Sequence, residues 1–318
     1  MTLDVLTFGE AMLRLSPPTG EPLARAAHFD LHVAGAEANV AVALAGLGRS
    51  VTWISRLPDN DLGRRVSRDL AAAGVDLSHV GWESAGRLGT YFVELGTGPR
   101  GVSVIYDRQG SAATAMTSED LPAREVARAR LVHLTGITPA LSRSCQEATE
   151  TAATWARGSD TLLSVDINYR AKLWSVGDAR RCLERIAAGA DLAVCTAEDA
   201  RDVFGLKGDA ADVAAGLGDR LGSTYTVVTD GADGAVCWHH GVASRVDATP
   251  TGIVDRLGAG DAFTAGVVDG LLDGDIDDGL RRGSVLAAVA LATRGDQVWV
   301  TRSELNRLLG SGGRRLDR

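Results

Sequence analysis

Gly258, Gly260 and the carboxylate of Asp261 stand close together in the run DRLGAGDAF, from Asp255 to Phe263. Gly258 and Gly260 can adopt backbone angles that other residues avoid, so successive N–H groups can converge where a helix is predicted to begin. Such a point attracts an anion, and Asp261 beside it could accept a proton from a hydroxyl group. The run suggests phosphoryl transfer, although a glycine turn followed by an aspartate helix cap would use the same residues.

A second polar group follows the apolar run 162–166. Asp166, Asn168 and Arg170 occupy alternate positions, which directs their side chains to one side of an extended chain. Ligands bind at the carboxyl ends of the strands in an open α/β sheet, so these side chains are candidates for a site. A solvated loop in which Asp166 caps a turn is the alternative.

Two further segments are ambiguous when taken alone. Gly35 begins a predicted helix, and Asn39 in its first turns could bind a sugar hydroxyl or a neighbouring backbone group. Residues 225–234 look like a strand that ends in a glycine turn, a pattern that many hairpins share.

Several common cofactor sites are disfavoured. The chain has only two lysines, Lys172 and Lys207, and neither has the spacing of a phosphate-binding loop or a protein kinase. The one GxGxxG match, residues 96–101, precedes a strand-like run where a dinucleotide site needs a helix. The histidines and four cysteines show no metal-binding spacing, and we expect reduced thiols. A nucleotide would therefore depend on backbone amides, arginines and a metal ion.

The composition indicates a globular protein that acts on a small molecule. The chain has 318 residues, 45% of them hydrophobic, which is enough for a sizeable core. A net charge of −8 disfavours nucleic acid or an anionic membrane as a partner. No basic leader followed by an apolar stretch, and no apolar run of membrane-spanning length, is present in the sequence. We expect a cytoplasmic location.

The elements that must position these residues alternate along the chain. Strand-like runs cover residues 5–9, 51–55, 131–135, 162–166, 192–195 and 225–229, and helical segments include 36–47, 63–73, 144–156 and 178–188. This alternation predicts an α/β fold with a mostly parallel sheet covered by helices. Residues 89–95 and 101–107 read as a hairpin, which with residues 12–15 and 29–33 could form a small separate sheet that acts as a lid.

Taken together, these segments resemble the ribokinase-like (PfkB) family of carbohydrate kinases over nearly the whole chain. The resemblance rests on GAEAN, from Gly35 to Asn39, and on DRLGAGDAF. Within the family, DINYRAKLW, from Asp166 to Trp174, looks most like the 2-keto-3-deoxygluconate kinases, and VIYDR, from Val104 to Arg108, agrees less specifically.

The resemblance implies a three-layer α/β/α core with a mostly parallel sheet and a small β-sheet lid. The core would comprise residues 1–11, 34–87 and 109–318, and the lid residues 12–33 and 88–108. The implied reaction moves the γ-phosphoryl group of ATP, with Mg²⁺, to the terminal hydroxyl of 2-keto-3-deoxygluconate (2-dehydro-3-deoxygluconate).

The resemblance also implies roles for individual residues. Asp261 would be the catalytic base, and the amides of Gly258, Ala259 and Gly260 the anion hole. The nucleotide would lie near Asn168, Thr229, Gly231 and Gly234, together with Gly258 and Gly260. The sugar acid would face Gly35, Asn39, Tyr91, Tyr106, Arg108, Arg170 and Asp296.

The sequence departs from the family pattern at three places, one of which is Asp230 in the nucleotide turn, where an apolar residue is more usual. Ala34-Gly35 stands where the family has two glycines. Thr196-Ala-Glu-Asp199 stands where the family has Asn-x-x-Glu, the segment that contacts the water shell of the metal. We therefore expect no direct protein ligand to the metal, with Glu198 or Asp199 as outer-sphere contacts.

The alternatives differ in substrate or in activity. Arg108 and Arg170 offer planar, permanently charged donors for a carboxylate, which favours a sugar acid over a neutral sugar such as fructose or ribose. They do not distinguish epimers or another aldonic derivative. A non-catalytic sugar or nucleotide sensor is disfavoured because Asp261 and its glycine turn are intact. The apolar faces of the predicted lid suggest a homodimer formed through it.

Overall fold

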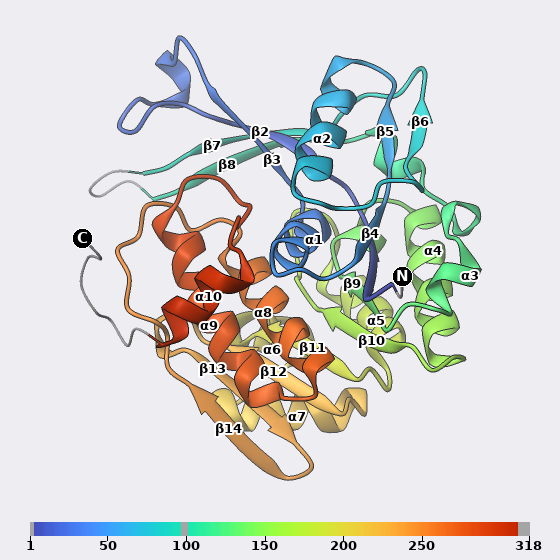
Figure 1. The fold of residues 1–318 in the computed structure, drawn as a ribbon, viewed down its shortest axis with the longest axis vertical. Coiled ribbons are helices and arrows are strands. Elements are labelled where there is room, and N and C mark those ends of the chain that lie inside the picture. Colours follow the sequence, from blue (N-terminus) through green and yellow to red (C-terminus); the bar gives the residue numbers. More distant parts are fainter. Residues whose placement is uncertain (1–2, 97–100, 311–318) are drawn as a thin grey trace.

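The three-dimensional structure is a computed structural model that describes residues 3–96 and 101–310 (Figure 1). Residues 97–100, in the predicted hairpin loop, lie outside the described residues. Within the described part, eight strands form the central sheet in the order β14-β13-β12-β11-β10-β9-β1-β4. They are β1 (Val5–Phe8), β4 (Val51–Ile54), β9 (Leu131–Thr135), β10 (Leu162–Asp166), β11 (Leu192–Thr196), β12 (Tyr225–Thr229), β13 (Ala235–His239) and β14 (Val242–Val246).

Six neighbouring strands of this sheet pair in parallel, as the alternating sequence pattern predicts: β4, β1, β9, β10, β11 and β12. β13 and β14 add an antiparallel hairpin at one edge, which the pattern of strand-like runs did not include. Its outer strand is largely exposed, so β14 lacks the apolar run that marks the buried strands.

Ten α-helices lie in the described part of the chain, and most of them cover the two faces of the central sheet. They are α1 (Ala36–Gly46), α2 (Asp61–Ala72), α3 (Ala123–Val126), α4 (Arg143–Arg157), α5 (Val176–Ala187), α6 (Ala197–Phe204), α7 (Ala210–Leu221), α8 (Ala259–Asp273), α9 (Ile276–Ala292) and α10 (Arg302–Gly310). Single turns of 3₁₀ helix lie at Leu23–Arg25, Ala112–Ala115, Ser118–Asp120, Thr138–Ala140 and Gly231–Asp233.

Neighbouring residues of one strand pack into two different hydrophobic cores. In β9, Leu131 packs in the core with α1 and α8, whereas Val132 packs in the core with α4 and α5. Successive side chains of a strand point to opposite faces, so this division shows a sheet that is buried on both sides. The fold is therefore the predicted three-layer α/β/α arrangement.

A second sheet lies apart from the first, at the upper left of Figure 1. This small sheet has the strand order β3-β2-β7-β8, with β2 (Met12–Ser16), β3 (Asp30–Ala34), β7 (Thr90–Glu94) and β8 (Ser103–Asp107). β7 and β8 pair antiparallel, as predicted, with Tyr91 opposite Tyr106. β5 (Arg56–Pro58) and β6 (Gly81–Glu83) form a separate two-stranded pair. That the small sheet moves as a lid stays a prediction.

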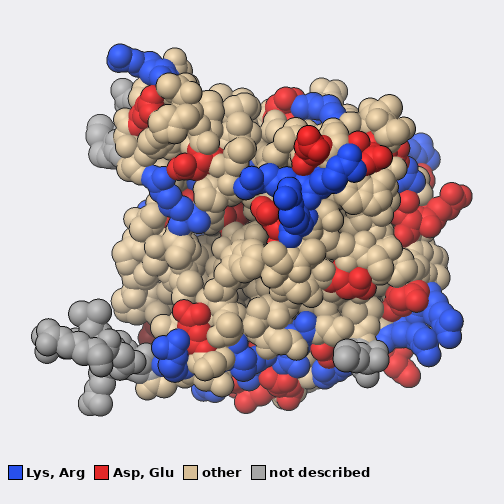
Figure 2. Space-filling model, turned by 45° about the horizontal axis from the view of Figure 1, so that its top comes forward, with Lys and Arg blue, Asp and Glu red and all other residues tan. Residues whose placement is uncertain are grey.

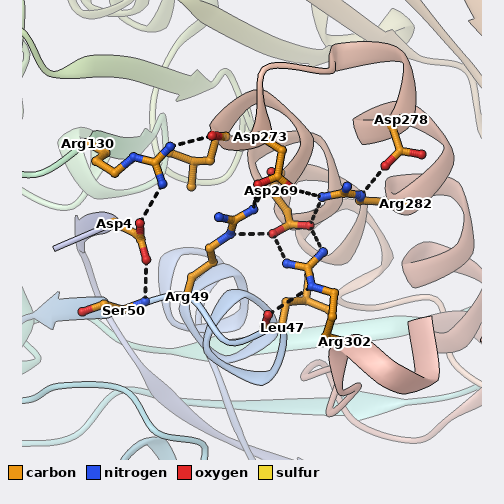
Figure 3. Close-up of polar contacts among 11 residues, drawn as sticks. Asp4, Leu47, Arg49, Ser50, Arg130, Asp269, Asp273, Asp278, Arg282 and Arg302 are labelled. Carbon is orange, nitrogen blue, oxygen red and sulfur yellow. Dashed lines mark hydrogen bonds and ion pairs between the residues drawn. The ribbon is translucent and has the colours of Figure 1, made fainter. Parts of the chain in front are cut away.

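A group of ion pairs joins α8, α9, α10 and the loop after α1 (Figure 3). The Asp269 carboxylate, fully buried in α8, contacts Arg49 Nε at 2.7 Å, Arg282 Nη1 at 2.5 Å and Arg302 Nη2 at 2.5 Å. We call these four residues the Asp269 cluster. Because the three arginines come from the loop after α1, from α9 and from α10, one carboxylate ties four parts of the chain together.

Charge on the surface shows no single sign on the face seen in Figure 2. Acidic and basic side chains are interspersed there. Among the described residues, no helix combines the length and apolar character needed to cross a membrane.

Candidate active site

A cavity of about 1260 Å³ lies between the small sheet and the carboxyl ends of the central strands. Most of the predicted site residues line it: Gly35, Asn39, Tyr91, Tyr106, Arg108, Asn168, Arg170, Asp199, Thr229, Gly258, Gly260, Asp261 and Asp296. Ala259, Gly231, Gly234 and Glu198 are not among its lining residues. The fold thus brings segments from both halves of the chain to one place.

The glycine turn forms the N-terminus of α8. Gly258 is the N-cap residue with φ of 80°, a left-handed conformation, and no side chain caps the helix. A Cβ atom at Gly258 would lie 2.0 Å from the backbone oxygen of Asp296, so both conformation and space require glycine there. At Gly260 a Cβ would meet no protein atom within 4 Å, which leaves room for a ligand. The first amides of α8 are therefore free to bind an anion.

Asp261 sits in the first turn of α8 and is held by one side chain. Asn39 Nδ2 donates to Asp261 Oδ2 at 2.6 Å, while Asn39 Oδ1 accepts from the backbone N–H of Gly35 at 3.4 Å. Burial, together with the charge of Asp166, raises the pKa of Asp261 to about 8, against the hydrogen bond from Asn39. A carboxyl group with a pKa near neutral pH is suited to accept a proton and release it again.

Gly35 is placed by close packing rather than by backbone strain. Its φ of 172° is extended, but a Cβ atom would lie 2.2 Å from the backbone oxygen of Glu10. The N-terminus of α1 thereby approaches the end of β1 closely enough for Asn39 to reach Asp261.

Asp166 and Asn168 form a second buried polar pair, at the end of β10. Asn168 Nδ2 donates to Asp166 Oδ2 at 3.1 Å, and Asn168 has φ of 38°, a region that asparagine tolerates better than most residues. Burial raises the pKa of Asp166 to about 7, against the hydrogen bond from Asn168 and the charge of Arg170. A strained backbone angle such as that of Asn168 is common at functional sites.

The residues suit a metal ion that keeps its water molecules. Among the described residues, no three His, Cys, Asp or Glu side chains are grouped to hold a metal directly. Asp166 and Asp199 line the cavity, and neither forms an ion pair within the described chain. Burial raises the pKa of Asp199, whose carboxylate accepts from the backbone N–H of Tyr169 at 3.3 Å. Hard oxygen acceptors of this type can bind the waters of Mg²⁺.

The wall next to the small sheet is aromatic and cationic. The rings of Tyr91 and Tyr106 stack at 5.5 Å, and the guanidinium carbon of Arg108 lies 5.7 Å from the centre of the Tyr106 ring. Arg108 Nε donates to the buried Glu10 carboxylate at 2.7 Å. Arg170, in contrast, is exposed and forms no ion pair with another described residue. The two predicted carboxylate-binding arginines therefore differ in how much of their charge is already neutralised.

The two predicted nucleotide-side glycines belong to the turn between β12 and β13. Gly234 has φ of 85°, and a Cβ there would lie 2.0 Å from the backbone oxygen of Val246. Gly231 is exposed, with φ of 58°. The geometry accounts for Gly234 by the shape of the hairpin alone, and its predicted contact with a nucleotide stays a prediction.

Several charged residues at or beside the cavity were missed from sequence, among them Glu10, Arg14 and Arg256. Glu10 pairs with Arg108, and Arg14 is buried beneath Asp296. Arg256 precedes the glycine turn, lines the cavity and is exposed. Arg256 lies inside the run that sequence reasoning singled out and could have been named. Glu10 and Arg14 carry no local signal, because their partners are 98 and 282 residues away.

Comparisons with known proteins agree with this geometry. The chain is 40% identical to a 2-dehydro-3-deoxygalactonokinase of Haloferax volcanii over the whole length of both proteins. It is 32% identical to a 2-dehydro-3-deoxygluconokinase of Thermoproteus tenax, over 92% of this chain and 90% of that one. A crystal structure of 2-dehydro-3-deoxygluconokinase from Thermotoga maritima has a TM-score of 0.88 at 29% identity, covering 96% of this chain and 99% of that one.

The sequence pattern of one family covers nearly the whole chain. It is the pfkB family carbohydrate kinase pattern, which matches residues 2–302. This match confirms the family predicted from DRLGAGDAF. The ribokinase-like fold and the predicted class of reaction, phosphoryl transfer to an alcohol group, are confirmed as well. The chain belongs to the pfkB family of carbohydrate kinases.

Proposed function

We propose that this protein transfers the γ-phosphoryl group of ATP to the terminal hydroxyl of a 2-dehydro-3-deoxy sugar acid. 2-Dehydro-3-deoxygluconate is the first candidate and its galactonate epimer the second, because relatives named for each substrate are similar to this chain. The observation that carries the proposal is the position of Asp261, in the first turn of an uncapped helix N-terminus that faces the cavity.

An acidic substrate is supported by the charges on the cavity wall. Arg170 and Arg256 line the cavity and form no ion pair with described residues. A planar guanidinium group can bind a carboxylate with two hydrogen bonds. Arg108 already forms an ion pair with Glu10, so Arg170 is the better candidate for the direct contact with the substrate carboxylate.

The proposed chemistry divides between one side chain and the backbone. Asp261 takes the proton of the substrate hydroxyl as that oxygen bonds to phosphorus, and the bond from phosphorus to the leaving ADP oxygen breaks. The amides of Gly258, Ala259 and Gly260 donate to the phosphoryl oxygens. Asn39 holds the Asp261 carboxylate in place. Bound Mg²⁺ would neutralise phosphate charge, with its waters held by Asp166, Asn168 and Asp199.

The adenosine part of ATP would extend towards the ends of β11 and β12. Thr229 and Thr196 line this side of the cavity. Gly231 and Gly234 follow in the next turn and would border the nucleotide from outside the lining.

A substrate panel tests the proposal. Purified protein is given ATP and Mg²⁺ with 2-dehydro-3-deoxygluconate, its galactonate epimer, fructose, ribose or adenosine, and ADP release is measured. We expect release with one or both sugar acids and little with the neutral compounds. Preference for fructose or ribose would refute the acid specificity, and no release with any compound would favour a non-catalytic sensor. Asp261→Asn is the control for contaminating kinases, because it should abolish the signal.

We further propose a homodimer formed through the small sheet. Leu31 in β3 and Ile105 in β8 expose 43% and 56% of their surface, which leaves apolar side chains on a sheet with two open edges. Light scattering during gel filtration should give twice the chain mass. An Ile105→Lys variant should shift the distribution to monomer, and a monomeric wild type would exclude this interface.

A further inference from the structure

Arg14 connects the small sheet to the glycine turn through two buried ion pairs. Its Nη2 atom lies 2.6 Å from Asp255 Oδ2 and its Nη1 atom 2.6 Å from Asp296 Oδ1. Its Nε donates to Ser16 Oγ at 2.9 Å. The Arg14 side chain is only 1% exposed, and Asp255 is fully buried. We call Arg14, Asp255 and Asp296 the Arg14 bridge.

The two carboxylates hold the two backbone segments that shape the anion hole. Asp255 Oδ1 accepts from the N–H of Leu257 at 3.1 Å, and Asp255 Oδ2 accepts from the N–H of Gly295 at 3.3 Å. The backbone oxygen of Asp296 is the atom that leaves no room for a Cβ at Gly258. Residues 255–258 and 295–296 therefore pack as one unit, and the Arg14 guanidinium is the group that joins their carboxylates.

The small sheet supplies both contacts to the Asp296 carboxylate. Arg14 in β2 binds Oδ1, and the Tyr91 hydroxyl in β7 donates to Oδ2 at 2.7 Å. β2 and β7 are neighbours that pair in parallel. A shift of these strands relative to the core would therefore pull directly on the loop that abuts Gly258.

Stability alone does not account for such a bridge. Replacing a buried ion pair by apolar residues is often neutral or stabilising, because desolvation offsets the attraction between the charges. The bridge also carries one guanidinium against two carboxylates, so it keeps a net charge of −1 next to a site that binds anions. The Arg14 bridge is better explained by its effect on geometry, because it fixes residues 255–258 against residues 295–296.

We propose that Arg14 is a positioning residue for phosphoryl transfer, which couples the position of the small sheet to the shape of the anion hole at residues 258–261. The proposal rests on the proposed kinase function. Arg14 does not line the cavity, so it acts through Asp255 and Asp296 and touches neither substrate. Misplacement of a reacting group by about 1 Å can reduce turnover about 100-fold, which is the scale of effect that a loosened turn would produce.

The first test is Arg14→Lys, which keeps the charge but replaces the planar fork with a single ammonium group. We expect kcat for the sugar acid to fall about 10- to 100-fold, with a smaller change in KM for ATP. Wild-type kcat in this variant would overturn the proposal. Arg49→Met is the matched control: it removes a largely buried arginine from the Asp269 cluster, so it should lower the Tm and leave kcat unchanged.

A charge-matched double variant tests whether Arg14 acts only by neutralising charge. Arg14→Met alone leaves two buried carboxylates, whereas Arg14→Met with Asp255→Asn leaves one, with the same net charge of −1 as the wild type. We expect the double variant to recover much of the Tm that Arg14→Met loses, while kcat stays low. Recovery of kcat together with Tm would show that Arg14 only neutralises charge.

Amide hydrogen exchange tests the coupling without reference to any sugar. Peptides that cover residues 255–261 and 90–94 should both exchange faster in Arg14→Lys than in the wild type, while residues 302–310 keep their protection. Unchanged exchange at 255–261 would refute the coupling. Failure of the wild type on the whole substrate panel would instead refute the proposed function and leave this measurement to decide the role of Arg14.

Discussion

Two of the three aspartates in helix α8, Asp261 and Asp269, lie in surroundings that have opposite effects on a negative charge. Asp261, in the first turn, is held by the neutral amide of Asn39, and burial raises its pKa to about 8. Asp269, eight residues later, is surrounded by arginines. Although burial opposes it, hydrogen bonds from Arg302 and Arg49 lower the pKa of Asp269 below its ordinary value. One carboxylate is left free to exchange a proton, and the other is committed to holding helices together.

The comparison shows how one helix serves both chemistry and stability. A base must change its protonation state, so it cannot be surrounded by permanent cations. A structural carboxylate is most useful when it never changes state. The separation of about 12 Å along the helix, from a rise of about 1.5 Å per residue, keeps the arginines of the Asp269 cluster away from Asp261.

The largest effect should come from Asp261→Asn. Loss of a general base typically reduces turnover by about 10²- to 10⁴-fold, and we expect kcat to fall in that range while ATP binding persists. Steady-state kinetics with titration calorimetry of ATP would check both. Turnover near the wild-type rate would show that Asp261 is not the base and would remove the contrast with Asp269.

Asp269→Asn should have the reverse profile. It leaves buried arginines without their shared partner, and breaking a buried pair destabilises a protein by about 3–5 kcal/mol. We expect the midpoint of urea unfolding to fall, and the kcat of the protein that remains folded to be unchanged. A large loss of kcat without loss of stability would mean that the Asp269 cluster influences the site directly.

The pH dependence of catalysis should follow Asp261. Because the base must be ionised and its pKa is about 8, kcat/KM should rise about tenfold per pH unit below pH 8 and level off above it. The Asp166 charge raises that pKa, so Asp166→Asn should move the inflection to lower pH. A profile that is flat from pH 6 to 9 would contradict this assignment.

The smallest effect is a gain in stability for Asp261→Asn. The pKa of Asp261 is higher in the folded protein than in the unfolded chain, so ionisation opposes folding increasingly as pH rises from about 4 to 8. We expect the variant to be more stable than the wild type by about 1–2 kcal/mol at pH 8. The difference should shrink towards pH 4, and thermal unfolding at both pH values would detect it. A variant less stable than the wild type at pH 8 would indicate that Asp261 is stabilised when charged.

Local patterns were sufficient for most of the core. The parallel strands were predicted because each is a short apolar run, and a strand buried on both faces has that composition wherever it occurs. The hairpin of β7 and β8 was predicted from two runs joined by a glycine-rich loop. Strand β14 was missed because it is largely exposed, and an exposed strand does not need an apolar sequence.

Within the site, the residues that the sequence determined by itself are those whose signal is local: the glycines and Asp261 of one turn, and Asp166 and Asn168 at the end of one strand. Only the tertiary structure decided that Asn39 holds Asp261, that Glu10 neutralises Arg108, and that Arg14 reaches Asp296. These partners are 98 to 282 residues apart in the chain, so only the packing of helices and strands that are distant in sequence brings them together.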